Sequence, residues 1–332
     1  MAGPQRIDPA AATEALREPG RRFMLKGAAL LALGLAAART PKHAAAAAAE
    51  PSPIPVPTQA PTPATSQMPT QAPVKEGVAE LAGTRLYYWD TGGSGPALVL
   101  LHPATGSALM WAHQQPVFAQ AGYRVIGYSR RGYFGSEPAR KDDPGIGADD
   151  LHQLVAHLGI EKFHAVSSAA GGSIATDYAL SHPERLLSLA VTSNSAGVRT
   201  GEIAQRAASL LPAGFDRMPP EFRELGPSYR AANPDGVRQW LELEHKSKSG
   251  ELVRQRFGNV ISAEKLNTIK IPTLLMTGDA DLYTPPSLLR MVGAQIPGSE
   301  VAIVPDTGHA IYWERPEVFN RAVLDFIGRH AK

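Results

Sequence analysis

The chain has 332 residues, and 43% of them are hydrophobic, which is enough for the buried core of one large α/β domain or two smaller ones. Its 33 basic and 31 acidic residues give a net charge of only +2, with no long basic run. This balance argues against nucleic-acid binding and favours a small-molecule substrate. The chain has no cysteine, which excludes disulfides, thiolate nucleophiles and cysteine metal sites.

Residues 1–43 have the pattern of an export signal. Arg21 and Arg22 precede a mildly apolar run of about a dozen residues that ends in alanines. The segment resembles a twin-arginine signal, whose arginine pair is read by the twin-arginine export machinery. The run is shorter than the roughly 20 residues that span a bilayer. We therefore expect a periplasmic or secreted protein with no stable membrane insertion after the signal is cleaved.

Residues 44–76 have the composition of a linker. This stretch is dominated by Ala, Pro, Thr and Gln. Such a composition cannot bury enough apolar surface to offset its ordering entropy, and its prolines favour extended polyproline II. The sequence thus predicts a spacer that leads into a folded domain over residues 77–332.

Strand and helix patterns alternate through this domain. Strand patterns occur at 84–93, 96–102, 123–129, 163–167, 186–193, 271–278 and 300–305, and helical patterns occur at 148–160, directly after 163–167, and at 315–327. Buried strands that alternate with helices predict the α/β class, with a mostly parallel sheet that has helices on both faces. The first strand is typical of an antiparallel edge.

The alternation breaks between about 195 and 269. Here the sequence becomes helix-like, with many charges and prolines. A segment of this length is more than a connection between two strands needs. We interpret it as a helical cap over the strand ends, which would supply substrate specificity.

Polar residues follow several of the predicted strands. They form the segments His102–Ser107, Ser167–Gly172, Asp279–Asp281 and Thr307–His309. Ligands of a parallel sheet bind beyond the carboxyl ends of its strands. These segments are therefore the candidates for a functional site.

Four motifs carry a resemblance to a known family. They read LLHPATGSALMW, YSRRGYFGS, GDADLYTPP and DTGHAIYWERPEVF in chain order. Together they resemble the α/β-hydrolase superfamily, most closely its capped esterases and carbon–carbon bond hydrolases. The resemblance implies the α/β-hydrolase fold, with a mostly parallel eight-stranded sheet and a helical cap insertion. It implies no metal and no organic cofactor.

The resemblance also implies site roles. His309 matches the catalytic base and Asp281 matches the acid that orients it, with Asp279 as the second candidate for the acid. The backbone amides of Ala104 and Ala170 match the two donors of an oxyanion hole. We expect this pair and these amides to act on one substrate carbonyl.

The nucleophile position holds an alanine. The family motif Gly-x-Ser-x-Gly corresponds here to Ser167-Ser168-Ala169-Ala170-Gly171, so small residues bracket Ala169 where the serine usually stands. A shift of the register by one or two residues would let Ser168 or Ser167 act instead. With Ser168 as nucleophile, the β-branched Val166 would occupy a tight position of the turn. With Ser167 as nucleophile, the helix would start two residues too late.

Several functional interpretations remain open at this point. The preferred one is an exported hydrolase for an ester, lactone or β-diketone, with Ala169 as a natural or engineered change and with His102 and Ser168 facing the substrate pocket. The alternatives are a non-hydrolytic enzyme that relies on the His–Asp pair, of lyase or cofactor-free oxygenase type, and a catalytically silent ligand-binding protein. Neither the substrate nor the oligomeric state can be read from the sequence.

Overall fold

The computed structural model describes residues 52–53, 68–250 and 252–330. Contacts divide the chain into residues 1–46 and 47–332, and all described residues belong to the second unit. The predicted export signal at 1–43 therefore lies outside the described residues.

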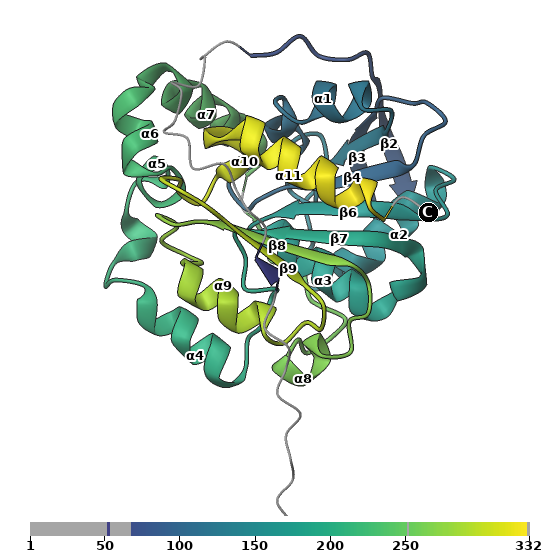
Figure 1. The fold of residues 1–332 in the computed structure, drawn as a ribbon. Coiled ribbons are helices and arrows are strands. Elements are labelled where there is room, and N and C mark those ends of the chain that lie inside the picture. Colours follow the sequence, from purple (N-terminus) through teal and green to yellow (C-terminus); the bar gives the residue numbers. More distant parts are fainter. Residues whose placement is uncertain (1–51, 54–67, 251, 331–332) are drawn as a thin grey trace, which may run out of the picture. The chain divides into compact units, whose positions relative to one another are not determined.

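A single mixed sheet forms the centre of the domain (Figure 1). Its strands are β1 Ser52–Pro53, β2 Lys75–Leu81, β3 Thr84–Asp90, β4 Ala97–Leu101, β5 Arg124–Tyr128, β6 Phe163–Ser168, β7 Leu186–Thr192, β8 Thr273–Gly278 and β9 Glu300–Val304. Their order across the sheet is β1-β9-β8-β7-β6-β4-β5-β3-β2. Only β2 and β3 run antiparallel to their neighbours, so the predicted mostly parallel sheet with an antiparallel edge is confirmed.

Two strands lie partly or wholly in the predicted linker at 44–76. β2 begins at Lys75, and the two-residue β1 pairs with β9 as a ninth strand beyond the expected eight. A two-residue strand flanked by prolines has no alternating pattern, so composition alone classified it as spacer.

Side chains of the central strands alternate between two hydrophobic clusters. On β4, Val99 and Leu101 enter one cluster, whereas Leu98 and Leu100 enter the other. Successive strand residues point to opposite faces, so a continuous apolar run is needed where both faces are covered. The buried strand predicted at 96–102 thus anchors both halves of the core.

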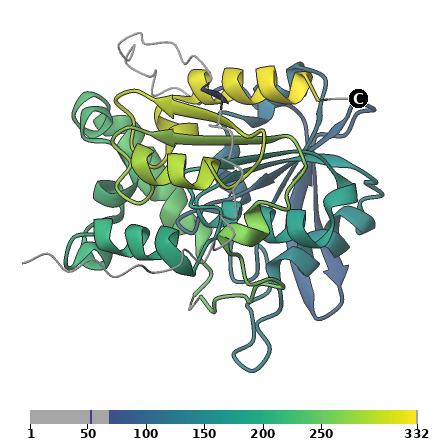
Figure 2. The same ribbon diagram turned by 60° about the horizontal axis from the view of Figure 1, so that its bottom comes forward.

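Helices cover both faces of the sheet (Figures 1 and 2). The helices of the sheet domain are α1 Gln115–Gln120, α2 Gly147–His157, α3 Ala170–Ser181, α9 Pro286–Gly293, α10 Ile311–Glu314 and α11 Pro316–Gly328, with short 3₁₀ turns at Ala108–Trp111 and Pro183–Arg185. Residues of α2, α3 and α9 pack in the first cluster, and residues of α1, α10 and α11 pack in the second. The predicted helices on both faces are therefore present.

A helical insertion separates β7 from β8. It comprises α4 Gly201–Leu210, a 3₁₀ turn at Phe215–Arg217, α5 Pro220–Glu224, α6 Pro227–Ala232, α7 Pro234–Ser247 and α8 Ala263–Leu266. Trp240 of α7 is fully buried in the second cluster and Leu266 of α8 in the first, so the insertion packs against the sheet domain at both points.

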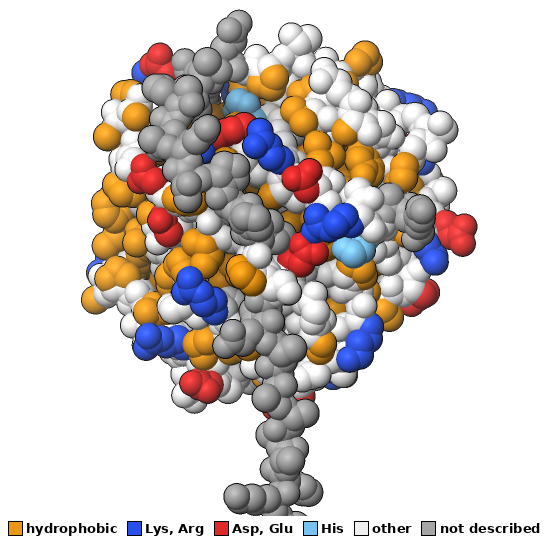
Figure 3. Space-filling view, viewed as in Figure 1, with side chains coloured by type: hydrophobic (Ala, Val, Ile, Leu, Met, Phe, Trp, Pro, Cys, Tyr) orange, Lys and Arg blue, Asp and Glu red, His pale blue; other side chains and the backbone are white. Residues whose placement is uncertain are grey.

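Acidic and basic side chains are interspersed on the face seen in Figure 3. None of the helices in the described part of the chain is long and apolar enough to cross a membrane.

Candidate active site

The candidate site lies where loops follow the carboxyl ends of β4, β6, β8 and β9. These strands lie within one stretch of the sheet, in the order β9-β8-β7-β6-β4. The parallel arrangement therefore gathers four loops that are far apart in sequence at one edge, as expected for ligand sites in such sheets.

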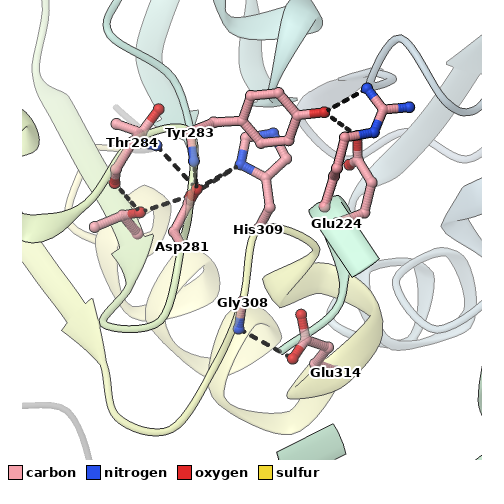
Figure 4. Close-up of polar contacts among 9 residues, drawn as sticks. Glu224, Asp281, Tyr283, Thr284, Gly308, His309 and Glu314 are labelled. Atoms are coloured by element: carbon pink, nitrogen blue, oxygen red, sulfur yellow. Dashed lines mark hydrogen bonds and ion pairs between the residues drawn. The ribbon is translucent and has the colours of Figure 1, made fainter. Parts of the chain in front are cut away.

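His309 and Asp281 are held together at this edge (Figure 4). Nδ1 of His309 lies 2.9 Å from both carboxylate oxygens of Asp281. The carboxylate also accepts hydrogen bonds from the amides of Tyr283 (2.8 Å) and Thr284 (2.9 Å) and from the Thr277 hydroxyl (2.9 Å). These donors fix the carboxylate, which in turn fixes the tautomer and orientation of the imidazole.

The charges of the two groups perturb each other. Burial opposes ionisation of Asp281, but the charge and hydrogen bond of His309 and the two amides outweigh it, so the pKa of Asp281 is lowered. Burial likewise opposes protonation of His309, yet the nearby carboxylates, Asp281 first, raise its pKa to about 9. The pair therefore rests as an imidazolium–carboxylate ion pair at neutral pH.

Nε2 of His309 is the atom available for chemistry. Within the described residues it has no hydrogen-bond partner, while Nδ1 is engaged by Asp281. The Tyr283 ring lies against the imidazole, with ring centroids 4.3 Å apart.

Asp279, the second candidate for the acid, is exposed, and its carboxylate accepts from the Thr307 amide at 3.4 Å, away from the imidazole. The geometry thus favours Asp281 over Asp279.

The turn between β6 and α3 has a strained apex at Ala169. Its backbone angles are φ 47° and ψ −120°, a region that a non-glycine residue rarely adopts. A side chain at Gly171 would approach the Leu101 carbonyl oxygen to 2.2 Å, and one at Gly172 would approach Asn194 to 2.9 Å. The crossing of helix and strand therefore requires these glycines, which fixes the register with Ala169 at the apex.

Neither neighbouring serine lies at the apex. The Ser167 hydroxyl donates to the Ala190 carbonyl oxygen at 2.7 Å, so it is a bonded sheet residue. Ser168 is the last residue of β6 and is 1% exposed. It is not among the described residues that line the cavity beside Ala170, and its place at the substrate pocket stays a prediction.

The two predicted oxyanion donors line one cavity. Ala104 and Ala170 both border a cavity of 410 Å³. Within the described residues, no group accepts a hydrogen bond from the amide of either residue. The Tyr133 hydroxyl donates to the Ala104 carbonyl oxygen at 3.1 Å and holds that loop. Two free amides beside a strained apex are an arrangement that can stabilise a developing oxyanion.

His102, predicted at the substrate pocket, lies beneath the loop after β5, and its role stays a prediction. It is fully buried, its Nδ1 lies 2.7 Å from the Pro103 carbonyl oxygen, and its Nε2 accepts from the Arg130 amide at 3.0 Å. Burial, followed by the charge of Arg130, holds its pKa well below the ordinary value. The loop after β5 folds over the imidazole through the contacts of Arg130.

A buried carboxylate from the helical insertion also faces the pair. Glu224 ends α5, is 5% exposed, and Figure 4 shows it on the side of His309 away from Asp281. Its Oε1 accepts from the Tyr283 hydroxyl at 3.3 Å. Burial raises the pKa of Glu224. Sequence reasoning missed this residue because the insertion has no motif; a lone acidic residue beside prolines carries no signal.

Glu314 ties the insertion to the histidine loop. Its Oε2 accepts from the amides of Gly226 (2.9 Å) and Gly308 (3.0 Å), and burial raises its pKa to about 7. The two glycines are required, because a Cβ on Gly308 would lie 2.3 Å from the Gly226 nitrogen. The loop carrying His309 is therefore held by α10 and by the insertion together.

The described residues contain no cluster of three or more His, Cys, Asp or Glu side chains that could hold a metal ion. The groups that the described residues bring to the site are an imidazole, carboxylates and backbone amides.

Several known proteins are similar to this chain in sequence. A family model described as the alpha/beta hydrolase family matches residues 98–322. The chain is 30% identical over 291 residues to a 2-hydroxy-6-oxononadienedioate/2-hydroxy-6-oxononatrienedioate hydrolase of Paraburkholderia phymatum, covering 77% of this chain and 94% of the relative. It is 27% identical over 279 residues to a 2-hydroxy-6-oxo-6-phenylhexa-2,4-dienoate hydrolase of Burkholderia cepacia, covering 74% and 92%.

Solved structures share the fold. An esterase of Thermogutta terrifontis superposes with a TM-score of 0.64 at 23% identity, covering 78% of this chain and all of the esterase chain. An enol-lactonase of Burkholderia xenovorans superposes with a TM-score of 0.57 at 21% identity, covering 76% of this chain and all of the lactonase chain.

Proposed function

Because the chain belongs to the alpha/beta hydrolase family, we propose that it acts on a small carbonyl compound, an ester, lactone or β-diketone, through His309, Asp281 and the amides of Ala104 and Ala170. The observation that carries the proposal is that Ala104 and Ala170, whose amides have no hydrogen-bond partner within the described residues, border one cavity. The names of the two relatives support the substrate class, since each describes a hydrolase of an oxo compound.

The proposed reaction does not pass through an acyl-enzyme at residue 169, because alanine stands at the apex. The methyl group of Ala169 supplies neither a nucleophile nor a proton. In the proposed reaction His309 Nε2 removes a proton from water as the water oxygen adds to the substrate carbonyl carbon. The negative charge on the carbonyl oxygen is held by the two amides, and the imidazolium returns the proton to the leaving group.

The charge state of His309 sets the pH dependence of this reaction. With a pKa of about 9, only roughly one imidazole in a hundred is neutral at pH 7. We expect the rate of a base-catalysed reaction to rise with pH up to about 9. A rate that is flat between pH 7 and 9 contradicts His309 as the base.

Substitution at the apex tests the proposal. Wild type and Ala169→Ser are assayed against p-nitrophenyl esters, lactones and β-diketones. A gain of about a thousand-fold or more on esters in Ala169→Ser indicates a hydrolase site that lacks its nucleophile, because removing that group from a true triad costs roughly a million-fold. If wild type turns over a lactone or β-diketone and Ala169→Ser turns it over at the same rate, the result indicates direct base catalysis.

Two further variants control this experiment. His309→Gln is expected to abolish turnover, while His245→Gln, whose imidazole on α7 is 78% exposed, is expected to leave turnover unchanged. Activity that survives in His309→Gln refutes the role of the pair. A ligand that binds but that no variant turns over indicates the ligand-binding alternative.

A non-hydrolytic reaction is the second candidate, and the absence of a nucleophile at Ala169 favours it. The same imidazole can remove a proton from a substrate carbon beside a carbonyl group held by the amides. Exchange of substrate C–H for deuterium in heavy water, without hydrolysis, is the result that distinguishes this reaction.

Export is proposed as well. The support is the arginine pair Arg21 and Arg22 before an apolar run. Cell fractionation of the full chain tests it: the protein is expected outside the cytoplasm, and an Arg21→Lys/Arg22→Lys variant is expected to stay inside. Equal export of both contradicts the twin-arginine route.

A further inference from the structure

Glu224 is a buried carboxylate to which the proposed reaction gives no role, although it lies beside the reacting imidazole. It ends α5 in the helical insertion and is 5% exposed. Figure 4 shows it on the side of His309 opposite to Asp281. Within the part of the chain that the structure describes, its carboxylate forms no ion pair with a lysine or arginine. Buried carboxylates usually have a charged partner, and the nearest candidate here is the histidine.

Both the backbone and the side chain of Glu224 are held in place. Its carbonyl oxygen accepts from the amide of Ala310, the residue that follows His309, at 2.9 Å. Its Oε1 accepts from the Tyr283 hydroxyl at 3.3 Å. The end of α5 is thus bonded to the loop that carries the imidazole. The carboxylate is therefore in position before any substrate binds.

Tyr283 connects the two carboxylates across the imidazole (Figure 4). Its amide donates to Asp281 at 2.8 Å, and its hydroxyl donates to Glu224 at 3.3 Å. Its ring lies against the ring of His309, with centroids 4.3 Å apart. On the insertion, the Phe215 ring packs edge-on against the tyrosine at 4.8 Å. The imidazole therefore has a fixed aromatic wall and a carboxylate on either side.

Three further titratable groups lie around these carboxylates. Arg223 donates to the Tyr283 hydroxyl at 3.1 Å, so it is linked to Glu224 through that hydroxyl. Glu314 of α10 uses its carboxylate to bind two backbone amides. Burial raises the pKa of Tyr312, which therefore stays neutral. The imidazole thus has the two flanking carboxylates as its main electrostatic partners.

The histidine and the carboxylate of the insertion change each other's affinity for protons. Among the charges that raise the pKa of His309, that of Glu224 comes second after that of Asp281. Burial raises the pKa of Glu224, and the charge of His309 opposes this rise. A carboxylate beside an imidazolium favours the charged form of both groups. Glu224 therefore acts in the same direction as Asp281.

We propose that Glu224 is a positioning residue: held by Tyr283, it stabilises the imidazolium of His309 from the side opposite to Asp281, so that the helical insertion controls how readily the histidine takes up a proton. The inference rests on the proposed function for the role of the histidine as the base. The contact of the insertion with the imidazole does not depend on that role. Loss of the charge of Glu224 should leave a larger fraction of the histidine neutral at pH 7.

Removal of this charge at nearly constant shape tests the inference without a substrate. In Glu224→Gln the amide oxygen can still accept from the Tyr283 hydroxyl. The Hε1 resonance of His309 is followed by proton NMR, and its pKa of about 9 is expected to fall by about one unit in the variant. Glu221→Gln is the matched control, because it removes a charge from a partly exposed side chain of the same helix. It is expected to leave the pKa of His309 unchanged.

Two more variants separate charge from packing. Glu224→Asp keeps the charge, and the pKa of His309 is expected to stay within about half a unit of wild type. Arg223→Gln removes the positive charge that offsets Glu224, and the pKa of His309 is expected to shift upward, opposite in sign to the shift in Glu224→Gln. Urea unfolding of each variant verifies that it is folded at the pH values of the titration.

The pH dependence of turnover gives a second readout. On a substrate that wild type turns over, the rate in Glu224→Gln is expected to level off at about pH 8 instead of about 9. At pH 7 the neutral fraction of His309 rises about tenfold, while the weaker base costs about threefold, so turnover should rise about threefold. A residue that only packs the insertion would lower turnover at every pH.

Three results overturn the inference: an unchanged pKa of His309 in Glu224→Gln, an equal fall in Glu224→Asp, or an equal fall in Glu221→Gln. A wild-type rate that rises up to about pH 9 with no change of the profile in Glu224→Gln also rejects the inference and keeps the proposed function. A fall of the pKa in Glu224→Gln together with full turnover in His309→Gln rejects the proposed function and keeps the electrostatic role of Glu224.

Discussion

Replacing Asp281 by Asn isolates the electrostatic control of His309. The amide has nearly the shape of the carboxylate, and its oxygen can still accept from the Tyr283 and Thr284 amides that fix position 281. The negative charge, which is the largest influence that raises the pKa of His309, is removed. The variant therefore changes the charge and leaves the packing in place.

The structure sets the size of the expected effect. The difference between a pKa of about 9 and the ordinary 6.5 corresponds to about 3 kcal/mol of preference for the protonated imidazole. Because the pKa of His309 is raised in the folded state, this stabilisation is present below pH 6.5 and is lost as the pH rises through about 9. We expect Asp281→Asn to bring the pKa of His309 to 6.5 or below, because burial then dominates.

Proton NMR titration measures this directly, without a substrate. The Hε1 resonance of His309 is assigned by its disappearance in His309→Gln and is followed from pH 5 to 10 in wild type and in Asp281→Asn. Asp279→Asn is the control, since that exposed carboxylate does not contact the imidazole. A wild-type pKa at or below 6.5, or an equal pKa in Asp281→Asn, would refute the ion-pair description of the site.

Three other predictions test parts of the fold that support the site. Gly171→Ala should lower the free energy of unfolding in urea by at least about 2 kcal/mol because its Cβ meets a β4 carbonyl oxygen at 2.2 Å, whereas Gly328→Ala in α11, where nothing lies within 4 Å, should be neutral or stabilising. Wild-type stability should fall from about pH 4.5 to 7 through the raised pKa of Glu314, and Glu314→Gln should reduce this slope. Arg131→Gln should destabilise by about 3 kcal/mol in thermal or urea unfolding, because Asp150 is then left buried without its ion-pair partner.

The sequence predicted the parts of the fold that are fixed by burial of the sheet. Apolar runs on buried strands predicted the α/β class, and the small residues around Ala169 predicted the register of the turn that the glycine contacts now explain. The proximity of His309 and Asp281 could be predicted because both follow neighbouring parallel strands. Their catalytic roles stay predictions.

The insertion and the loops were harder to predict. Glu224 at the end of α5 and Arg199 in the loop before α4 are placed by tertiary packing of the segment between β7 and β8, which no local pattern encodes. His102 showed a different limit: its place after β4 was clear, but the fold of the loop after β5 over its ring depends on contacts between distant segments. Sequence patterns located the edge of the sheet, while tertiary contacts decide which side chains reach the cavity.

The insertion is anchored asymmetrically, and this has an evolutionary consequence. Around Gly226 its backbone is clamped to the histidine loop through Glu314, so most substitutions there would disturb the base. The stretch from Leu252 to Phe257 borders the cavity and is held elsewhere, because the Arg256 backbone bonds to Gly145 and Gly147 and the Gln255 side chain donates to Asp150. Selection can therefore retune ligand preference through this stretch while the proton-transfer machinery stays unaltered, which separates the evolution of specificity from that of reactivity.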